Sequence, residues 1–276
     1  MKTRVLVGAA LLVLLGGILA FGPLFRSLVF TAAALISVFE MGRAFHNKGF
    51  RPCLWPLYLF AGAYYLLYRY GMAYYGNQAW GAGVYMLAVL CLVLLCGERI
   101  FNQKRTMEDM AASLFVLVYP LGLYVALMLT SEWDTAALLL CFAGPLMGDT
   151  AAYFVGSALG KHKLCPHISP KKTVEGSIGG FIGGALGGLL TFALQGVLPG
   201  SQHFHLGALM AIGLLCGGVG QIGDLFASTI KRWAGIKDYG NIFPGHGGIM
   251  DRLDSVLMCA PVVYALLFMP VFMGAR

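Results

Sequence analysis

The sequence is poor in charge. Only 11% of its 276 residues are Asp, Glu, Lys or Arg, whereas 59% are hydrophobic and the mean hydropathy is +0.77. Ordinary globular domains carry about 25% charged residues, so this composition argues against a water-soluble domain. It predicts an all-α, polytopic integral membrane protein, in which the useful unit of counting is an apolar span of about 20 residues.

Patterned metal ligands are also lacking. The seven cysteines are scattered, mostly inside apolar runs, and show no paired ligand spacing, and the six histidines form no His-x-x-x-His pair. This argues against a zinc site and against a disulfide framework, so the cysteines are interpreted as small core residues. The apolar start of the chain has no clear cleavage pattern after it. We therefore expect a first membrane span there rather than a signal peptide.

Long apolar runs make up most of the chain and predict about nine transmembrane helices. They cover residues 5–21, 24–39, 53–68, 79–96, 111–129, 136–156, 177–198, 206–226 and 255–273. The first five carry little chemistry, so residues 1–135 are predicted to be a scaffold, Glu40 included. Residues 136–276 are predicted to be the catalytic region, with cytoplasmic loops at 157–176 and 227–254.

The positive charges predict the orientation. Sixteen of the nineteen Lys and Arg residues fall on the N-terminus and the even-numbered loops, and only Arg26, Arg69 and Arg276 fall on the other side. The positive-inside rule then places the N-terminus and the loop 227–254 in the cytoplasm and predicts a multi-pass protein of the cell's inner membrane. The net charge of +7 suits anionic lipid headgroups and requires no nucleic-acid partner.

One stretch concentrates charge, glycine and proline: residues 228–255, STIKRWAGIKDYGNIFPGHGGIMDRLDS. Its cations suit polyanionic phosphates, whereas its carboxylates would repel phosphate unless a divalent metal ion lay between them. The cations are Lys231, Arg232, Lys237 and Arg252, and the carboxylates are Asp251, Asp254 and the upstream Asp224. The pattern predicts a metal-bridged phosphate site.

Glycines within this stretch predict a tight turn. Gly245, Gly247 and Gly248 surround His246 after Pro244, so the backbone can adopt positive φ and approach a ligand closely. The alternative is a solvated basic loop before an N-capped helix. That alternative explains single charges but not the whole cluster.

Two features upstream add to the site. Asp149 interrupts an apolar run, and a carboxylate at membrane depth should face a partner or a polar cavity. The basic segment 169–176, SPKKTVEG, has Thr173 or Ser169 as a candidate helix cap.

Glycines then recur every four residues from Gly176 to Gly188. This spacing leaves one helix face almost bare, so another helix can approach it closely. Packing within the monomer is favoured, and a homodimer seam remains the alternative.

The polar positions of residues 228–254, with Gly148-Asp149-Thr150 and Ser169-Pro-Lys-Lys-Thr-x-Glu-Gly176, resemble the signature of the phosphatidate cytidylyltransferases, or CDP-diacylglycerol synthases. The resemblance runs from about Gly144 to Ser255, and the earlier spans match only in hydropathy. It implies a magnesium-dependent transfer of CMP from CTP to phosphatidic acid, giving CDP-diacylglycerol and pyrophosphate for phospholipid biosynthesis. A second metal ion is left open.

On this resemblance, roles can be assigned to single residues. Metal ligands are Asp224 and Asp251, with Asp149 and Asp254 as alternatives or orienting groups. Contacts to the triphosphate and the lipid phosphate come from the side chains of Lys231, Arg232, Lys237, Arg252, Lys171 and Lys172 and from the backbone of Gly245, Gly247 and Gly248. Hydrogen bonds to departing pyrophosphate come from Ser228 and His246, and Asp238 is counted with the catalytic residues.

Two other functions remain open on the sequence. A related CTP-dependent enzyme acting on another lipid phosphate would share these residues and differ only in its lipid groove. An ion-coupled transporter would also place Asp149 and Asp224 in the membrane. It predicts an inverted repeat, however, whereas the polar chemistry lies in the second half alone.

Overall fold

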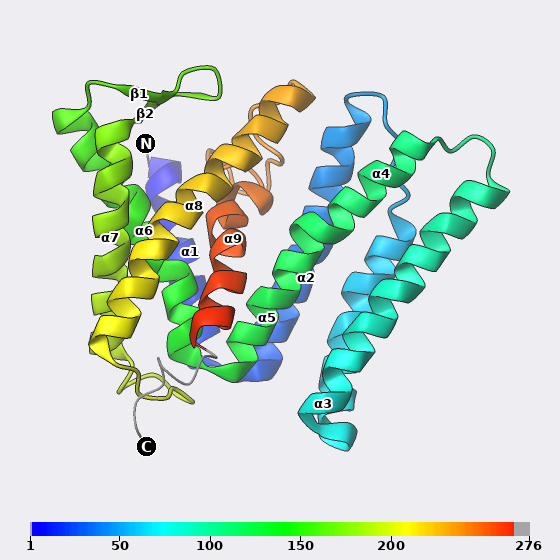
Figure 1. The fold of residues 1–276 in the computed structure, drawn as a ribbon, viewed down its shortest axis with the longest axis horizontal. Coiled ribbons are helices and arrows are strands. Elements are labelled where there is room, and N and C mark those ends of the chain that lie inside the picture. Colours follow the sequence, from blue (N-terminus) through cyan, green and yellow to red (C-terminus); the bar gives the residue numbers. More distant parts are fainter. Residues whose placement is uncertain (1, 268–276) are drawn as a thin grey trace.

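The computed structural model describes residues 2–267, and side chains throughout that range except at residues 2–5 and 68–82. The fold is a helical bundle with one small hairpin (Figure 1). Its elements are α1 (Lys2–Ala20), α2 (Pro23–His46), α3 (Trp55–Phe101), α4 (Met107–Val116), the π-helical turn η1 (Leu117–Gly122), α5 (Leu123–Trp133), α6 (Thr135–Leu159), β1 (Lys163–Cys165), β2 (Ser169–Thr173), α7 (Val174–Leu194), α8 (Leu206–Ala234) and α9 (Met250–Leu267).

Six stretches of helix are long and apolar enough to cross a membrane within the described part of the chain. They comprise α2, residues 83–101 of α3, residues 107–133, α6, α7 and α8. The all-α, polytopic class is therefore supported, while the count of nine stays a prediction. The described side chains of α1 form an apolar stretch from Leu6 to Ala20, and α9 carries three charges in its first turn and a half.

The third and fourth predicted spans form one helix, α3, of 47 residues. A straight helix of that length would be about 70 Å long. Its two ends are nevertheless in contact, because Trp55 Nε1 donates a 2.9 Å hydrogen bond to Glu98 and Cys91 Sγ lies 3.6 Å from the Pro56 carbonyl oxygen. The helix therefore folds back on itself, as two antiparallel spans would (Figure 1).

Capping side chains set several helix starts. Asp134 begins α6 by accepting a 2.8 Å hydrogen bond from Ala137 N, and Thr106 begins α4 with a capping box to Asp109. Thr173 begins α7, its hydroxyl accepting from Gly176 N at 3.1 Å. Of the two caps predicted for this helix, Thr173 is confirmed.

Glycine contacts join α6, α7 and α8. A Cβ atom built on Gly184 would lie 2.7 Å from the Gly217 Cα of α8, and one on Gly187 would lie 2.5 Å from the Ala143 carbonyl oxygen of α6. These glycines therefore let both neighbouring helices approach α7 at backbone distance. The predicted packing within the monomer is confirmed.

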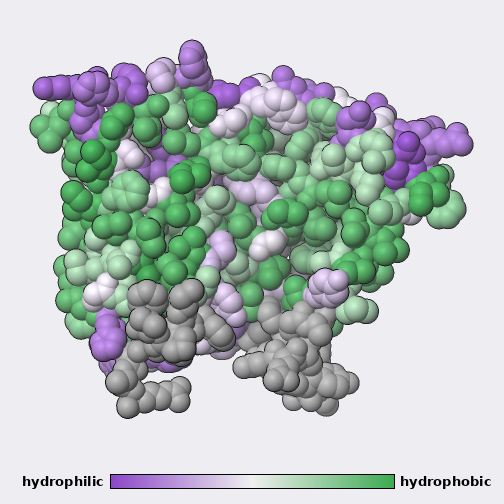
Figure 2. Space-filling view, in the orientation of Figure 1, coloured by the Kyte–Doolittle hydropathy of each residue, from purple (hydrophilic) through white to green (hydrophobic). Residues whose placement is uncertain are grey.

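Polar residues gather at one edge of the molecule, called here the polar edge: the connections 47–54 and 102–106, the β1–β2 hairpin and the loop 235–249 (Figures 1 and 2). The even-numbered loops of the charge count therefore lie together. At the opposite edge buried Arg26 donates to the Ser131 carbonyl and to Thr135 Oγ1. Of the residues in that count, the side chains of Lys2, Arg4 and Arg69 and all of Arg276 lie outside the described residues.

Candidate active site

A cavity of about 550 Å³ opens between β2 and helices α6, α7, α8 and α9. Seven of the residues predicted for the site line it: Asp149, Lys171, Lys172, Asp224, Asp251, Arg252 and Asp254. They come from segments spread over about a hundred residues. The fold therefore brings the two predicted polar regions, around residues 149–176 and 224–254, to one site.

The carboxylates of this cavity lie close together. Asp254 is buried, and its burial together with the nearby negative charges of Asp224 and Asp149 raises the pKa of its carboxyl group. Asp224 is paired with Lys172, whose Nζ lies 2.5 Å from its Oδ2. Three carboxylates facing one space repel one another unless a cation lies between them.

This donor set fits Mg²⁺ together with a nucleotide. Within the described residues no group of three His, Cys, Asp or Glu side chains is already arranged to hold a metal ion. Protein-bound Mg²⁺ usually takes only one or two carboxylates, with substrate phosphates and water as its other ligands. Asp224 with Asp254 or Asp149 would hold such an ion, with Lys171, Lys172 and Arg252 close by for phosphate oxygens.

Asp251 is enclosed by protein groups, its side chain being 2% exposed. Its Oδ1 lies 2.7 Å from Lys231 Nζ, and its Oδ2 accepts hydrogen bonds from Tyr239 N at 2.7 Å and Gly248 N at 2.9 Å. The geometry gives Asp251 the role of holding the loop 235–249 against α8. Its predicted metal ligation stays a prediction.

Tyr239 anchors the same loop from within. Its side chain is fully buried, and its hydroxyl donates a 3.0 Å hydrogen bond to the Ala227 carbonyl. Burial raises the pKa of Tyr239, with the nearby Tyr119 and Asp251 acting in the same direction. The phenol therefore stays a neutral donor at physiological pH.

The glycine turn has the predicted backbone. Gly245 and Gly247 have φ angles of 78° and 85°, and Phe243 N donates a 2.9 Å hydrogen bond to the Gly247 carbonyl across the turn. The amide of Gly248, however, points at Asp251, and the Glu40 carboxylate occupies the space beside its Cα. A carboxylate there would repel phosphate, so in this geometry the turn serves to position Asp251. Its predicted contact with phosphate stays a prediction.

Glu40 is the residue that sequence reasoning placed in the scaffold and that the structure brings to the site. It is 1% exposed and accepts hydrogen bonds from Ile249 N at 3.1 Å and Met250 N at 2.8 Å, where α9 begins. One turn later in α2, Arg43 donates to the Tyr239 carbonyl. The only local signal was a carboxylate at the end of an apolar span.

The remaining predicted side chains are not among the residues that line the cavity. The side chain of Lys231 is 11% exposed and is paired with Asp251. Arg232 is exposed, and its Nε lies 3.5 Å from the Ile168 carbonyl oxygen. Lys237 and Asp238 are exposed, and Ser228 is half-buried. His246 is half-buried, and its Nδ1 has no hydrogen-bond partner among the described residues.

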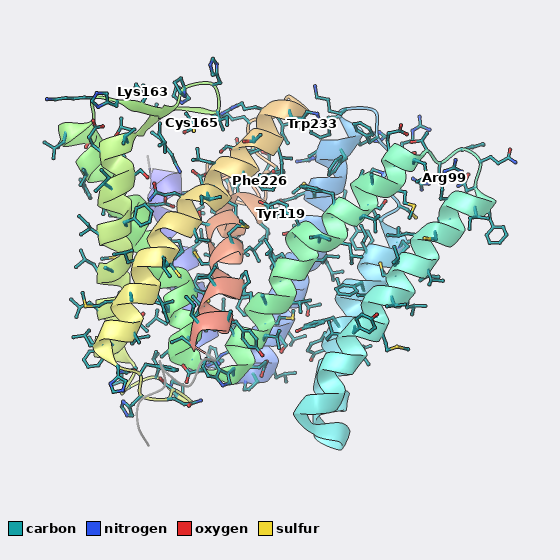
Figure 3. The ribbon with its side chains drawn as sticks, viewed as in Figure 1. Arg99, Tyr119, Lys163, Cys165, Phe226 and Trp233 are labelled. Carbon is teal, nitrogen blue, oxygen red and sulfur yellow. The ribbon has the colours of Figure 1, made fainter. Side chains whose placement is uncertain are left out.

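The hairpin that carries the two cavity lysines is tied to α7. Glu175 accepts hydrogen bonds from Lys161 N at 3.0 Å and from the His162 ring at 2.7 Å. Lys163 and Cys165 lie on this hairpin at the polar edge (Figure 3). Lys171 and Lys172 lie on β2, the second strand of this hairpin, and line the cavity.

Gln221 lines the cavity, and sequence reasoning did not single it out. It is buried in α8 and donates to the carbonyls of Gly217 at 2.8 Å and Ser177 at 3.2 Å. Its place three residues before Asp224, in an otherwise apolar run, is the signal that could have found it. It locks α8 to α7 beneath the carboxylates.

Aromatic rings join α8 to the first half of the chain (Figure 3). Phe226 packs edge-on against Tyr119 of η1, with ring centroids 4.9 Å apart, and Trp233 stacks on Phe50 at 5.7 Å. The first half of the chain thus supports α8 on the side away from α7.

The sequence is similar to those of known proteins. Residues 2–269 match the model of the "Cytidylyltransferase family". The phosphatidate cytidylyltransferase of Aquifex aeolicus is 43% identical over 168 residues, covering 60% of this chain and 61% of that protein. The enzyme of the same name from Bacillus subtilis is 47% identical over 119 residues, 43% of this chain and 42% of that protein.

A third relative, from Staphylococcus saprophyticus and of the same name, is 35% identical over 181 residues, covering 66% of this chain and 68% of that protein. The matches to the Aquifex and Bacillus proteins span less than two thirds of their length. The family model, by contrast, covers nearly all of the sequence. The chain belongs to the cytidylyltransferase family.

Proposed function

We propose that the protein transfers the CMP moiety of CTP to phosphatidic acid, giving CDP-diacylglycerol and pyrophosphate. The observation that carries the proposal is the cavity in which three mutually close carboxylates meet three cations. The names of the relatives support the choice of substrates. The proposal also covers residues 136–276 as the catalytic region and residues 1–135 as its scaffold.

The reaction needs a nucleophile, and phosphatidic acid supplies its own. Its phosphate is already anionic at neutral pH, so no protein base is required. A lipid phosphate oxygen forms a bond to the α-phosphorus of CTP, and the bond from that phosphorus to the α–β bridging oxygen breaks. The electron pair leaves with pyrophosphate.

The protein's task is then to hold two polyanions in line and neutralise their charge. Lys171, Lys172 and Arg252 line the cavity and would contact phosphate oxygens. Bound Mg²⁺ supplies charge neutralisation at the triphosphate, held by Asp224 with Asp254 or Asp149. Lys172, which is paired with Asp224 in this structure, would contact a substrate phosphate.

Both substrates must reach this cavity. Its wall on α6 includes Leu146 and Tyr153, which are 48% and 72% exposed and offer an apolar surface to acyl chains. Its other rim is the charged hairpin at the polar edge. We place that edge in the cytoplasm, in line with the charge count, so that the site is open to the bilayer and to soluble CTP.

A single assay tests the proposed substrates. Purified protein would receive CTP labelled at the α-phosphorus, with phosphatidic acid, phosphatidylglycerol, phosphatidylinositol or a polyprenyl phosphate in separate reactions. We expect a labelled CDP-lipid and stoichiometric pyrophosphate with phosphatidic acid alone. Transfer to polyprenyl phosphate but not to phosphatidic acid would establish the other lipid as the substrate. No transfer to any lipid, with ion uptake into vesicles, would favour the transporter.

A further inference from the structure

A second cavity, of about 530 Å³, lies at the polar edge away from the catalytic one, and we call it the basic cavity. It is bounded by the end of α2, the connection to α3 and the turn after α3. Among its lining residues are five that are cationic or can become so: Arg43, His46, Arg51, Lys104 and Arg105. No carboxylate belongs to the described residues that line it.

Two of these cations, Arg51 and Lys104, have anchored backbones and exposed side chains. The backbone of Arg51 is held, because its N–H donates to buried Asp109 and its carbonyl accepts from the Arg105 side chain. Lys104 is held by its own N–H, which donates to Asn102 Oδ1 at 3.2 Å. Neither the Arg51 nor the Lys104 side chain forms a hydrogen bond or ion pair within the described part of the protein. The backbones of Arg51 and Lys104 are anchored, and the charged groups of both side chains can contact an anion in the cavity.

The apolar surface beside the cations indicates the kind of anion. Phe39 and Leu54 also line the basic cavity, and Phe39 is 55% exposed. Next to it, at the two ends of α3, Trp55 is 45% and Phe101 is 89% exposed. A free phosphate would gain nothing from this apolar rim, whereas the acyl chains of a lipid would cover it.

We propose that the basic cavity binds the headgroup of an anionic phospholipid, with its acyl chains against the apolar rim. The volume suits a phosphate with its glycerol. Such a lipid would lie beside the catalytic loop, because Arg43 both lines the basic cavity and donates to the Tyr239 carbonyl. Lipid binding here is separate from turnover, so it can be tested whatever reaction the protein catalyses.

The test uses native mass spectrometry of the full-length protein released from micelles that contain phosphatidylglycerol and phosphatidylcholine with identical acyl chains. We expect wild type to retain phosphatidylglycerol preferentially. The double variant Arg51→Gln/Lys104→Gln should lose about 30-fold in apparent affinity, since two cations near an anionic surface are removed. The control Lys161→Gln/Lys163→Gln removes two cations from the hairpin end of the same edge, and it should bind like wild type.

Three results would overturn the proposal. Equal loss in both double variants would mean a diffuse surface charge rather than a site. Unchanged binding in the Arg51/Lys104 variant would exclude this cavity. Retention of inorganic phosphate or glycerol 1-phosphate as tightly as phosphatidylglycerol would identify a site for soluble anions. An unchanged unfolding midpoint in each variant would show that the fold is intact.

Discussion

Glu40 accepts a 2.8 Å hydrogen bond from the Met250 amide, 210 residues further along the chain. Its other carboxylate oxygen accepts from Ile249 N at 3.1 Å. A negative charge at the start of α9 is placed where the helix dipole favours it. Because α9 carries Asp251 and Asp254 within its first two turns, a residue of the scaffold sets the position of two residues of the candidate active site.

Replacing Glu40 should therefore affect both stability and turnover. Glu40→Ala leaves the amides of half-buried Ile249 and buried Met250 without acceptors, and hydrogen bonds to a charged group contribute about 1.5–3 kcal/mol each. We expect a lower unfolding midpoint and, because the carboxylates shift, about a 100-fold lower kcat with a smaller change in the KM for CTP. Glu98→Gln, at the exposed contact with Trp55, is the control. Similar behaviour of the two variants would contradict the role given to Glu40.

The buried pair of Lys231 and Asp251 makes a second prediction. Asp251→Asn leaves the Lys231 ammonium, 11% exposed, without its partner, and such a loss costs about 3–5 kcal/mol. Lys231→Met/Asp251→Asn removes both charges and should recover most of that stability, but not activity. Unfolding midpoints of the two single variants and the double variant give the coupling. Strictly additive effects would show that the pair is not coupled.

Asp224 should behave differently from Asp251. The side chains of Asp224 and Lys172 are about one third and about one quarter exposed, so their pair contributes less than the enclosed pair of Lys231 and Asp251. Asp224→Asn should thus keep the wild-type unfolding midpoint while lowering CTP-dependent product formation about 100-fold. The measurement is CTP-dependent product formation as a function of Mg²⁺ concentration for wild type and Asp224→Asn. Glu108→Gln, which removes an exposed carboxylate outside the cavity, is the control. Near-normal turnover of Asp224→Asn at saturating Mg²⁺ would remove Asp224 from the metal ligands.

The charged residues of the candidate site stood out in the sequence because charge is rare in this chain. A carboxylate such as Asp149 in an apolar run stands out at once, and the cavity indeed contains it together with Asp224 and Asp254. Local rules also sufficed for the Thr173 cap and for the positive φ of Gly245 and Gly247. These features depend on a few neighbouring residues, and they are the ones that sequence patterns report.

Partnerships across the chain could not be read in the same way. Nothing near Asp251 tells that its oxygens will be taken by Lys231, Tyr239 and Gly248. The same holds for Glu40, whose partners are set by how α2 packs beside the loop 235–249. Such contacts depend on tertiary packing. The hydropathy pattern predicts where the membrane spans lie but not which side chains meet between them.

Close helix packing through Gly184 gives a fourth prediction. A Cβ there would meet the backbone of Gly217 at 2.7 Å, and backbone cannot move aside as a flexible side chain can. Gly184→Ala should destabilise the protein by about 1–3 kcal/mol, as overpacking does. Gly97→Ala in α3 is the matched control, because a Cβ atom on Gly97 would meet no neighbouring side chain or helix within 4 Å. It should leave the unfolding midpoint unchanged or raised.

The side of the membrane on which the active site lies can be tested with single cysteines. Tyr239 is fully buried and would make a poor probe, so exposed positions at the two edges are chosen: Lys163 on the hairpin and His203 before α8. Cys165→Ser is the background, since the native thiol of Cys165 lies beside the first probe. Intact spheroplasts would be treated with a maleimide that cannot cross membranes.

We expect His203→Cys to be labelled in intact spheroplasts and Lys163→Cys only after permeabilisation. The physical reason is the accumulation of sixteen of the nineteen Lys and Arg residues on the loops of one side, which the positive-inside rule places in the cytoplasm. CTP is made and held there, so the orientation and the proposed reaction stand together. Labelling of Lys163→Cys in intact spheroplasts would show that the hairpin and the cavity face the outside of the cell. The cavity would then have no access to cytoplasmic CTP, and the proposed function would be wrong.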